Sequence, residues 1–100
     1  MAVLKMSHST ITVGTSSTAV TQQNSARKYL LIQNASDEII EIKFGAPAAS
    51  GAGLVLNPLG EPGSNAIFSE GRKNLTFQPV NAICASGSKA LRVTEGVEDV

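Results

Sequence analysis

The sequence predicts an all-β fold, and two observations carry this prediction. Short runs of alternating apolar and polar residues recur along the chain, and clusters of Gly, Pro, Asn and Ser separate them. In the clearest run, from Ile40 to Phe44, apolar residues occupy alternate positions while Glu41 and Lys43 lie between them, which is the period of two of a half-buried strand. About seven or eight such strands, with turn signals roughly every eight to twelve residues, are typical of a small antiparallel β-sandwich or barrel.

The N-terminal segment, residues 1–24, is dominated by Ser, Thr, Gln and Asn. Ser9 to Val13 alternates and is expected to form an edge strand, whereas Thr15 to Asn24 is expected to be a second weak strand or a loose arm. A segment of this composition cannot pack alone and often orders against a partner. The chain therefore divides into a polar N-terminal arm, 1–24, and one sandwich domain, 25–100. The favoured partner contacts are the apolar residues of the arm, around Ile11, Val13 and Val20.

The central part of the chain is expected to form a β-hairpin. Its strands are Tyr29 to Gln33 and Ile40 to Phe44, and Gly45 ends the second. The polar turn between them begins with Asn34 to Asp37, whose side chains can bond their own backbone.

A second hairpin is expected near the C-terminus. Asn81 to Ala85 and Lys89 to Thr94 flank a Ser-Gly-Ser turn in which Gly87 can take a positive φ. Glu95-Gly96 is expected to end the last strand, and 97–100 to form a short acidic tail.

Shorter strands are expected between the two hairpins, over Leu54–Leu56, Asn65–Phe68 and Leu75–Gln78, with a charged loop over 70–74. Pro79 places the last of these at an edge or ends it. The predicted core consists of apolar residues of all these strands: Leu30, Ile32, Ile40, Ile42, Phe44, Leu54, Leu56, Ile83, Leu91 and Val93.

Size and charge narrow the class of protein. One hundred residues make one domain, and a core with only four aromatic residues and no Trp has a small stability reserve. Burial against a partner would add to it, so a homo-oligomer, either a dimer or a trimer, is expected. Eight basic residues balance eight acidic ones without a basic block, which argues against a nucleic-acid partner.

No set of residues predicts catalysis, a metal or a cofactor. His8 and Cys84 are the sole residues of their kinds and lie far apart in the sequence, with His8 expected in solvent and Cys84 in the core or sheet. The acidic pairs Asp37-Glu38 and Glu98-Asp99 fall in a turn and a tail, where solvated patches are more common than catalytic carboxylates. The chain is therefore expected not to be an enzyme.

Targeting signals are also not expected. The first eight residues do not read as a secretory signal, and no apolar run is long enough to cross a membrane. The protein is expected to be made in the cytoplasm and to be soluble there.

Three motifs resemble those of small β-sandwich proteins encoded in the structural-gene blocks of tailed bacteriophages. An R-x-x-L-x-I-Q-N strand (27–34) is followed by I-x-x-x-F-G (40–45) and, after a small-residue loop, by G-x-x-L (53–56). The closing segments 81–87 and 91–96 also resemble the ending of that family, so the likeness covers roughly residues 20–96. The segment 59–65 departs from the family's glycine-and-aromatic stretch, which places a family-wide contact there in doubt.

The resemblance implies a jelly-roll-like sandwich that acts as a virion accessory protein without catalytic residues. The expected function is capsid decoration: the protein, made in the host cytoplasm, binds the major capsid protein on the virion surface and stabilises the head. The alternative is a small fibre, neck or tail module that recognises host-surface glycan, which would favour aromatic residues in surface loops. A cupin-type enzyme of similar architecture needs several His and Glu ligands, and this chain has a single His.

Overall fold

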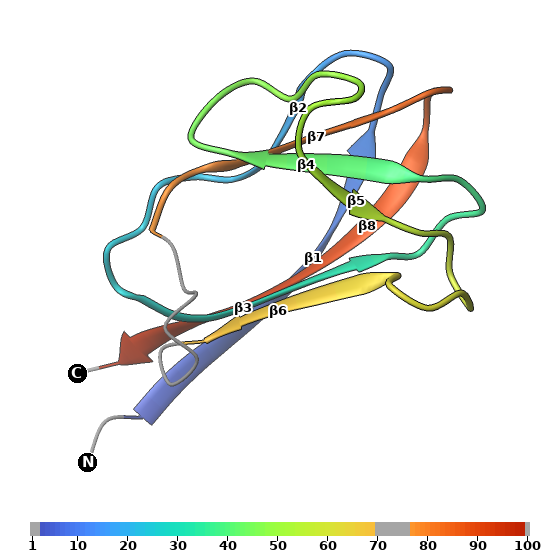
Figure 1. The fold of residues 1–100 in the computed structure, drawn as a ribbon. Helices are drawn as coiled ribbons and strands as arrows, with labels where there is room; N and C mark the ends of the chain where they lie inside the picture. The colour runs from blue at the N-terminus through green and yellow to red at the C-terminus, as the bar shows by residue number, and fades with distance from the viewer. Residues whose placement is uncertain (1–2, 70–76, 100) are drawn as a thin grey trace.

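The computed structural model describes residues 3–69 and 77–99, and these residues form an all-β fold (Figure 1). The strands are β1 (Val3–Val13), β2 (Thr18–Thr21), β3 (Arg27–Asn34), β4 (Ile40–Phe44), β5 (Leu54–Leu56), β6 (Asn65–Ser69), β7 (Val80–Cys84) and β8 (Lys89–Asp99). The predicted charged loop at 70–74, with Arg72 and Lys73, lies outside the described residues, as does part of the predicted strand Leu75–Gln78.

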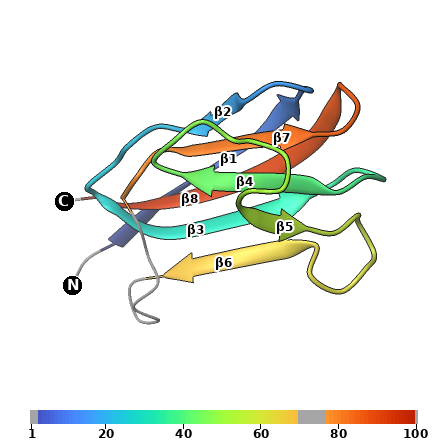
Figure 2. The same ribbon diagram turned by 45° about the horizontal axis from the view of Figure 1, so that its top comes forward.

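The strands form two antiparallel four-stranded sheets that pack face to face (Figure 2). Sheet A has the order β1-β8-β3-β6 and sheet B the order β2-β7-β4-β5. Successive strands lie in opposite sheets, except that β4 and β5 are neighbours in sheet B. This is the double-sheet arrangement of a jelly roll, and the predicted fold class is confirmed.

Neither of the two predicted hairpins is present. β3 lies in sheet A and β4 in sheet B, and β7 and β8 are separated in the same way, so both polar turns carry the chain from one sheet to the other. Instead, β3 pairs with β6 and β8, and β4 pairs with β7 and with the strand that follows it, β5. Alternation marks a strand with one buried face but does not say which strand it pairs with, so an arch and a hairpin have the same pattern.

The core lies between the sheets and consists of aliphatic side chains. Seven of the ten predicted core residues are buried: Leu30, Ile32, Ile40, Ile42, Leu56, Leu91 and Val93. Phe44 is only half-buried, and its ring meets Phe68 of the other sheet edge-on at 5.2 Å between centroids. Leu54 lies at the free edge of sheet B and is 42% exposed.

The predicted orientation of β7 is wrong. Val80, Ala82 and Cys84 point into the core, and Ile83 therefore lies on the outer face of sheet B. Val80 begins the strand one residue before its expected start, at a position that follows Pro79.

Two buried polar residues close the ends of the sandwich, one at each end of β3. Arg27 and Asn34 are both 0% exposed. The Asn34 amide donates hydrogen bonds to the carbonyl oxygens of Glu38 (2.7 Å), in the turn that leads into sheet B, and of Leu56 (3.0 Å), at the end of β5. No buried side-chain nitrogen or oxygen of the described residues lacks a hydrogen-bond partner.

The N-terminal segment differs from the arm predicted over 1–24. Its described residues are extended and polar as expected, but they supply an edge strand to each sheet, β1 to sheet A and β2 to sheet B. The boundary at residue 24 therefore does not separate an arm from a sandwich domain.

The C-terminal strand is longer than predicted. β8 continues through Gly96 to Asp99, where an end at Glu95-Gly96 and an acidic tail were expected. It is held on both sides, by β1 along its whole length and by β3 up to Val97. Gly96 lies between Met6 and Tyr29, and a Cβ atom there would stand 2.8 Å from Met6 Sδ and 3.1 Å from Tyr29 Cβ. The glycine thus permits close packing inside the sheet.

Candidate functional site

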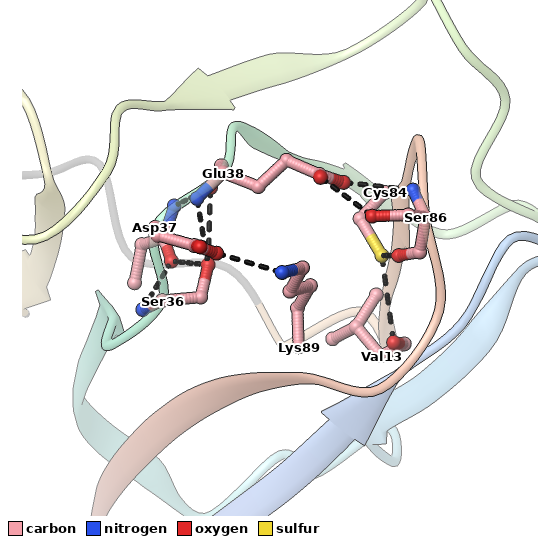
Figure 3. Close-up of polar contacts among 8 residues, drawn as sticks. Val13, Ser36, Asp37, Glu38, Cys84, Ser86 and Lys89 are labelled. Carbon is pink, nitrogen blue, oxygen red and sulfur yellow. Dashed lines mark hydrogen bonds and ion pairs between the residues drawn. The ribbon is translucent and has the colours of Figure 1, made fainter.

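At the end of the sandwich opposite the termini, the β3–β4 and β7–β8 turns are tied together by side chains (Figure 3). The Glu38 carboxylate accepts hydrogen bonds from the backbone N–H and the hydroxyl of Ser86, at 2.7 and 2.6 Å. Beside it, the Lys89 ammonium donates to Asp37 at 2.7 Å. These contacts join the two turns across the sandwich.

Both carboxylates of this cluster are held in the ionised form. The hydrogen bond and the charge of Lys89 lower the pKa of Asp37, and the hydroxyl and the N–H of Ser86 lower the pKa of Glu38. Correspondingly, the hydrogen bond to Asp37 raises the pKa of Lys89. A general acid needs the opposite shift, so this geometry suits a link between turns better than acid catalysis.

Cys84 lies next to the cluster, but its thiol points into the core. Its Sγ is 3.4 Å from the carbonyl oxygens of Val13 and Gly14, and the residue is 6% exposed. Burial raises the pKa of the thiol. The predicted core position of Cys84 is confirmed, and the environment is unlike that of a reactive cysteine, which is exposed and has a lowered pKa.

A groove of about 710 Å³ runs across the outer face of sheet B, between this cluster and the β4–β5 loop. In the register of the sheet, Ile83, Glu41 and Val55 stand side by side on β7, β4 and β5. They face outward because Ala82 and Ile42, one position along, are buried. The groove is lined by apolar side chains and by three carboxylates, and no basic residue of the described segments 3–69 and 77–99 lines it. The lining residues are Thr15, Asp37, Glu38, Ile39, Glu41, Ser50, Pro58, Ile83, Cys84 and Ala85.

The loop 45–53 folds back over sheet B (Figure 1), and its Ser50 forms one wall of the groove. The N–H of Gly51 donates to both carboxylate oxygens of Glu41, at 3.1 and 2.9 Å. The amide of Asn81 donates to the carbonyl oxygen of Ala46 at 2.8 Å, and the N–H of Ala48 donates to Ser17 Oγ at 2.8 Å. The loop is thus fastened to three different segments, and Glu41 lies at its foot.

The outer face of sheet A is the second open surface. His8 is exposed, as predicted, and its Nδ1 is 2.9 Å from Thr94 Oγ1. Arg92 lies in the next row, between Thr10 of β1 and Gln33 of β3, and is also exposed. A shallow hollow of about 320 Å³ surrounds these side chains.

The residues favoured as partner contacts lie elsewhere than expected. Val13 and Val20 are buried in the core, at 0% and 8% exposure, and Ile11 packs against it. These apolar side chains are therefore used within the chain. The exposed side chains of β1 among those described are residues 5–10 and Thr12.

Sequence reasoning missed the groove. Ile83 was assigned to the core, and Glu41 was noted only as an outward-facing strand residue. The outward orientation of Glu41 was the one available signal, because the groove arises from a loop that returns over the sheet. The described residues contain no group of three or more His, Cys, Asp or Glu side chains placed to hold a metal. They also include no helix long and apolar enough to cross a membrane.

Comparison with known proteins supports the fold alone. No family model matches the chain, and no curated protein matches it. Among solved structures, one similar chain comes from a study entitled "Bacillus endospore appendages form a novel family of disulfide-linked pili". It has a TM-score of 0.56 and 15% sequence identity, over 99% of this chain and 89% of the other. At this identity, the similarity describes a shared sandwich architecture.

Proposed function

We propose that this chain is a non-enzymatic structural protein of a tailed-bacteriophage virion, a decoration protein that binds the major capsid protein and stabilises the head. The sequence motifs that resemble those of phage accessory proteins support the proposal, and a jelly roll is the fold that this resemblance implies. The protein is made in the host cytoplasm, acts on the capsid surface, and binds no nucleic acid or membrane.

The observation that carries the proposal is the free edge of β1. This strand has eleven residues and ends the order of sheet A, so no strand of the described part of the chain pairs with its second edge. The side chains of residues 5–10 are exposed on both faces of the strand. A long strand edge of this kind can add an extended segment of another protein through main-chain hydrogen bonds.

Many copies on one shell would make a modest interface effective, because release of one copy leaves its neighbours bound. Binding to the assembled shell favours that state by mass action. Within this proposal the protein also self-associates as a homo-oligomer.

The alternative, a fibre, neck or tail module that recognises glycan, has less support. Of the four aromatic side chains, only Phe77 is exposed, at 44%, so few rings are available for stacking on sugars. The structural neighbour is described as forming pili, in keeping with a sandwich that serves as a repeating subunit. A disulfide link is not favoured here, because Cys84 is buried.

The test is binding to expanded empty heads built from the major capsid protein of the same genome. The wild-type protein is expected to co-sediment with the heads and to raise their resistance to heat. Proline is then placed at Ser9 and at Thr10, one at a time. Because neighbouring N–H groups in a strand point to opposite sides, one variant loses a ladder bond to β8 and the other blocks only the free edge.

Thermal unfolding distinguishes the two proline variants, because the variant that loses a ladder bond to β8 is destabilised and the other is not. The variant that keeps wild-type stability is expected to bind heads at least roughly tenfold more weakly, about 1.4 kcal/mol or more. Undiminished binding by that variant would remove the β1 edge from the mechanism, and no binding by the wild-type protein would reject the decoration function. Deletion of 1–24 is not a suitable test, because it removes Val13 and Val20 from the core.

A further inference from the structure

Both outer faces of the sandwich carry large exposed apolar side chains. In a solvated antiparallel sheet the outer face is normally polar. Here four of the large exposed hydrophobic residues stand on these faces: Met6 (42%) and Ile67 (38%) on sheet A, and Ile39 (48%) and Val55 (46%) on sheet B. No helix or strand of the described residues covers either face.

The groove of the sheet B face and the centre of the sheet A face carry opposite charges. The centre of the sheet A face carries Arg92, which has no hydrogen bond or ion pair with any described residue and is flanked by the uncharged Thr10 and Gln33. The groove in the sheet B face carries Glu38 and Glu41, with Asp37 at its edge already paired to Lys89. Lys43 is the nearest basic residue along β4, and it does not line the groove.

We propose that the occupant of the groove is a second copy of this chain, whose sheet A face stacks on the sheet B face with Arg92 inserted beside Glu41. The apolar part of the arginine side chain would lie on Ile39 and Ile83, and the guanidinium would meet the carboxylate from the groove side. Among the described residues, the Glu41 carboxylate accepts a hydrogen bond only from the Gly51 N–H, so it keeps the capacity to accept further hydrogen bonds.

The dimensions of the molecule are adequate for such an interface. Its two longer extents are 43 and 27 Å, and a standard interface buries about 800 Å² on each partner. Because two different faces meet, the contact is heterologous and leaves one free face at each end of the pair. The stack therefore adds further copies in the same way and does not stop at a two-fold dimer. The inference rests on the proposed function and specifies the surface used by its homo-oligomer, with an open stack in place of the expected dimer or trimer.

The experiment is sedimentation of the full chain from about 10 µM to 1 mM, with association followed by mass action. The weight-average mass of the wild-type protein is expected to keep rising with concentration beyond that of a dimer. Glu41→Arg and Arg92→Glu are each expected to weaken association by roughly tenfold or more, because each places like charges together. The double variant, Glu41→Arg with Arg92→Glu, restores the opposite charges and is expected to recover most of the wild-type association.

Two matched reversals serve as controls: Lys5→Glu, near the end of β1, and Glu61→Arg, in the β5–β6 connection, both at exposed positions. They change net charge as the test variants do and are expected to leave association unchanged. A wild-type protein that stays monomeric, a closed dimer, or a double variant weaker than either single one would overturn the stack. Head binding is measured separately, so failure of the decoration function leaves this result intact, and the reverse also holds.

Discussion

Arg27 and Glu95 form an ion pair inside the end of the sandwich at which both termini lie (Figure 1). The guanidinium Nε–H donates to the Glu95 carboxylate at 2.6 Å, and the side chain of Arg27 is fully buried while that of Glu95 is 21% exposed. Three further N–H groups of Arg27 donate to the carbonyl oxygens of Gln78 (3.1 Å) and Gln22 (2.9 Å) and to the hydroxyl of Thr21 (3.1 Å). One side chain from β3 therefore ties sheet A to the end of β2 and to the segment that leads into β7.

Replacement of Arg27 is expected to destabilise the protein strongly. Arg27→Ala leaves Glu95 without its partner and two backbone carbonyl groups without their donor, so a loss of about 3–5 kcal/mol in the free energy of unfolding is expected. Lys5→Ala, which removes an exposed basic side chain from the same sheet, is the control and is expected to change the free energy of unfolding by no more than about 0.5 kcal/mol. Urea denaturation measures both. A cost below about 1 kcal/mol for Arg27→Ala would show that the pair is not a structural link.

The loop that walls the groove depends on Gly53. Its φ is +148°, and a Cβ atom there would stand 2.4 Å from the carbonyl oxygen of Ile42. Gly51 in the same loop also has positive φ, +81°, but a Cβ atom there would meet nothing within 4 Å. Gly51→Ala is therefore expected to cost only the backbone strain, about 1 kcal/mol, and Gly53→Ala at least about 2–3 kcal/mol. Equal costs for the two variants, measured by thermal unfolding, would contradict this account of the loop.

Much of the sandwich follows from the sequence because the informative motif is a set of inward-facing residues. In R-x-x-L-x-I-Q-N, the side chains of Arg27, Leu30, Ile32 and Asn34 are all fully buried. Gly53 and Leu56 of the G-x-x-L motif are a sterically required glycine and a core residue. The motifs thus specify where the strands are, which of their faces is turned inward and which residues form the core, so the fold class could be predicted. By themselves they say nothing about binding.

What could not be predicted depends on contacts between distant segments. The turns at 35–39 and 85–88 were expected to close hairpins, because polar turn residues favour any reversal of the chain. Whether the chain turns back within one sheet or crosses to the other sheet is set by long-range hydrogen bonds, such as those that Asn34 donates to Leu56 and Ser86 donates to Glu38. The groove has the same origin, since Glu41 and Ser50 meet only when the β4–β5 loop folds back over the sheet.

The thiol of Cys84 is expected to be unreactive in the folded protein. It is buried, and burial raises its pKa, so the thiolate is scarce near neutral pH and reagents reach it only when the structure opens. Reaction with a disulfide reagent at pH 8 should be at least roughly a hundredfold slower than in denaturant, where the same thiol is free. Fast, stoichiometric labelling of the native protein would contradict the position assigned to Cys84.

The contacts of Asp37 and Glu38 with Lys89 and Ser86 make the stability of the folded protein depend on pH. The pKa values of Asp37 and Glu38 are lowered on folding by Lys89 and Ser86, so the unfolded chain binds more protons than the folded one in the acid range. The contribution of the two carboxylates to stability is therefore fully present at a pH above their pKa values in the unfolded chain, about 4. It is lost as the pH falls through their lower pKa values in the folded protein. In Asp37→Asn/Glu38→Gln, the melting temperature should be lower at neutral pH and should fall less on acidification below about pH 4.

At high pH, the contribution of Lys89 makes stability fall as the pH rises, which is the opposite dependence and provides the control. The pKa of Lys89 is raised by Asp37, so its contribution is present at neutral pH and is lost as the pH rises through that raised value. Lys89→Met should therefore remove part of the alkaline loss of stability while leaving Glu38 bonded to Ser86. If the double carboxylate variant and the wild type lose stability in parallel between about pH 5 and pH 2, these contacts do not clamp the two turns.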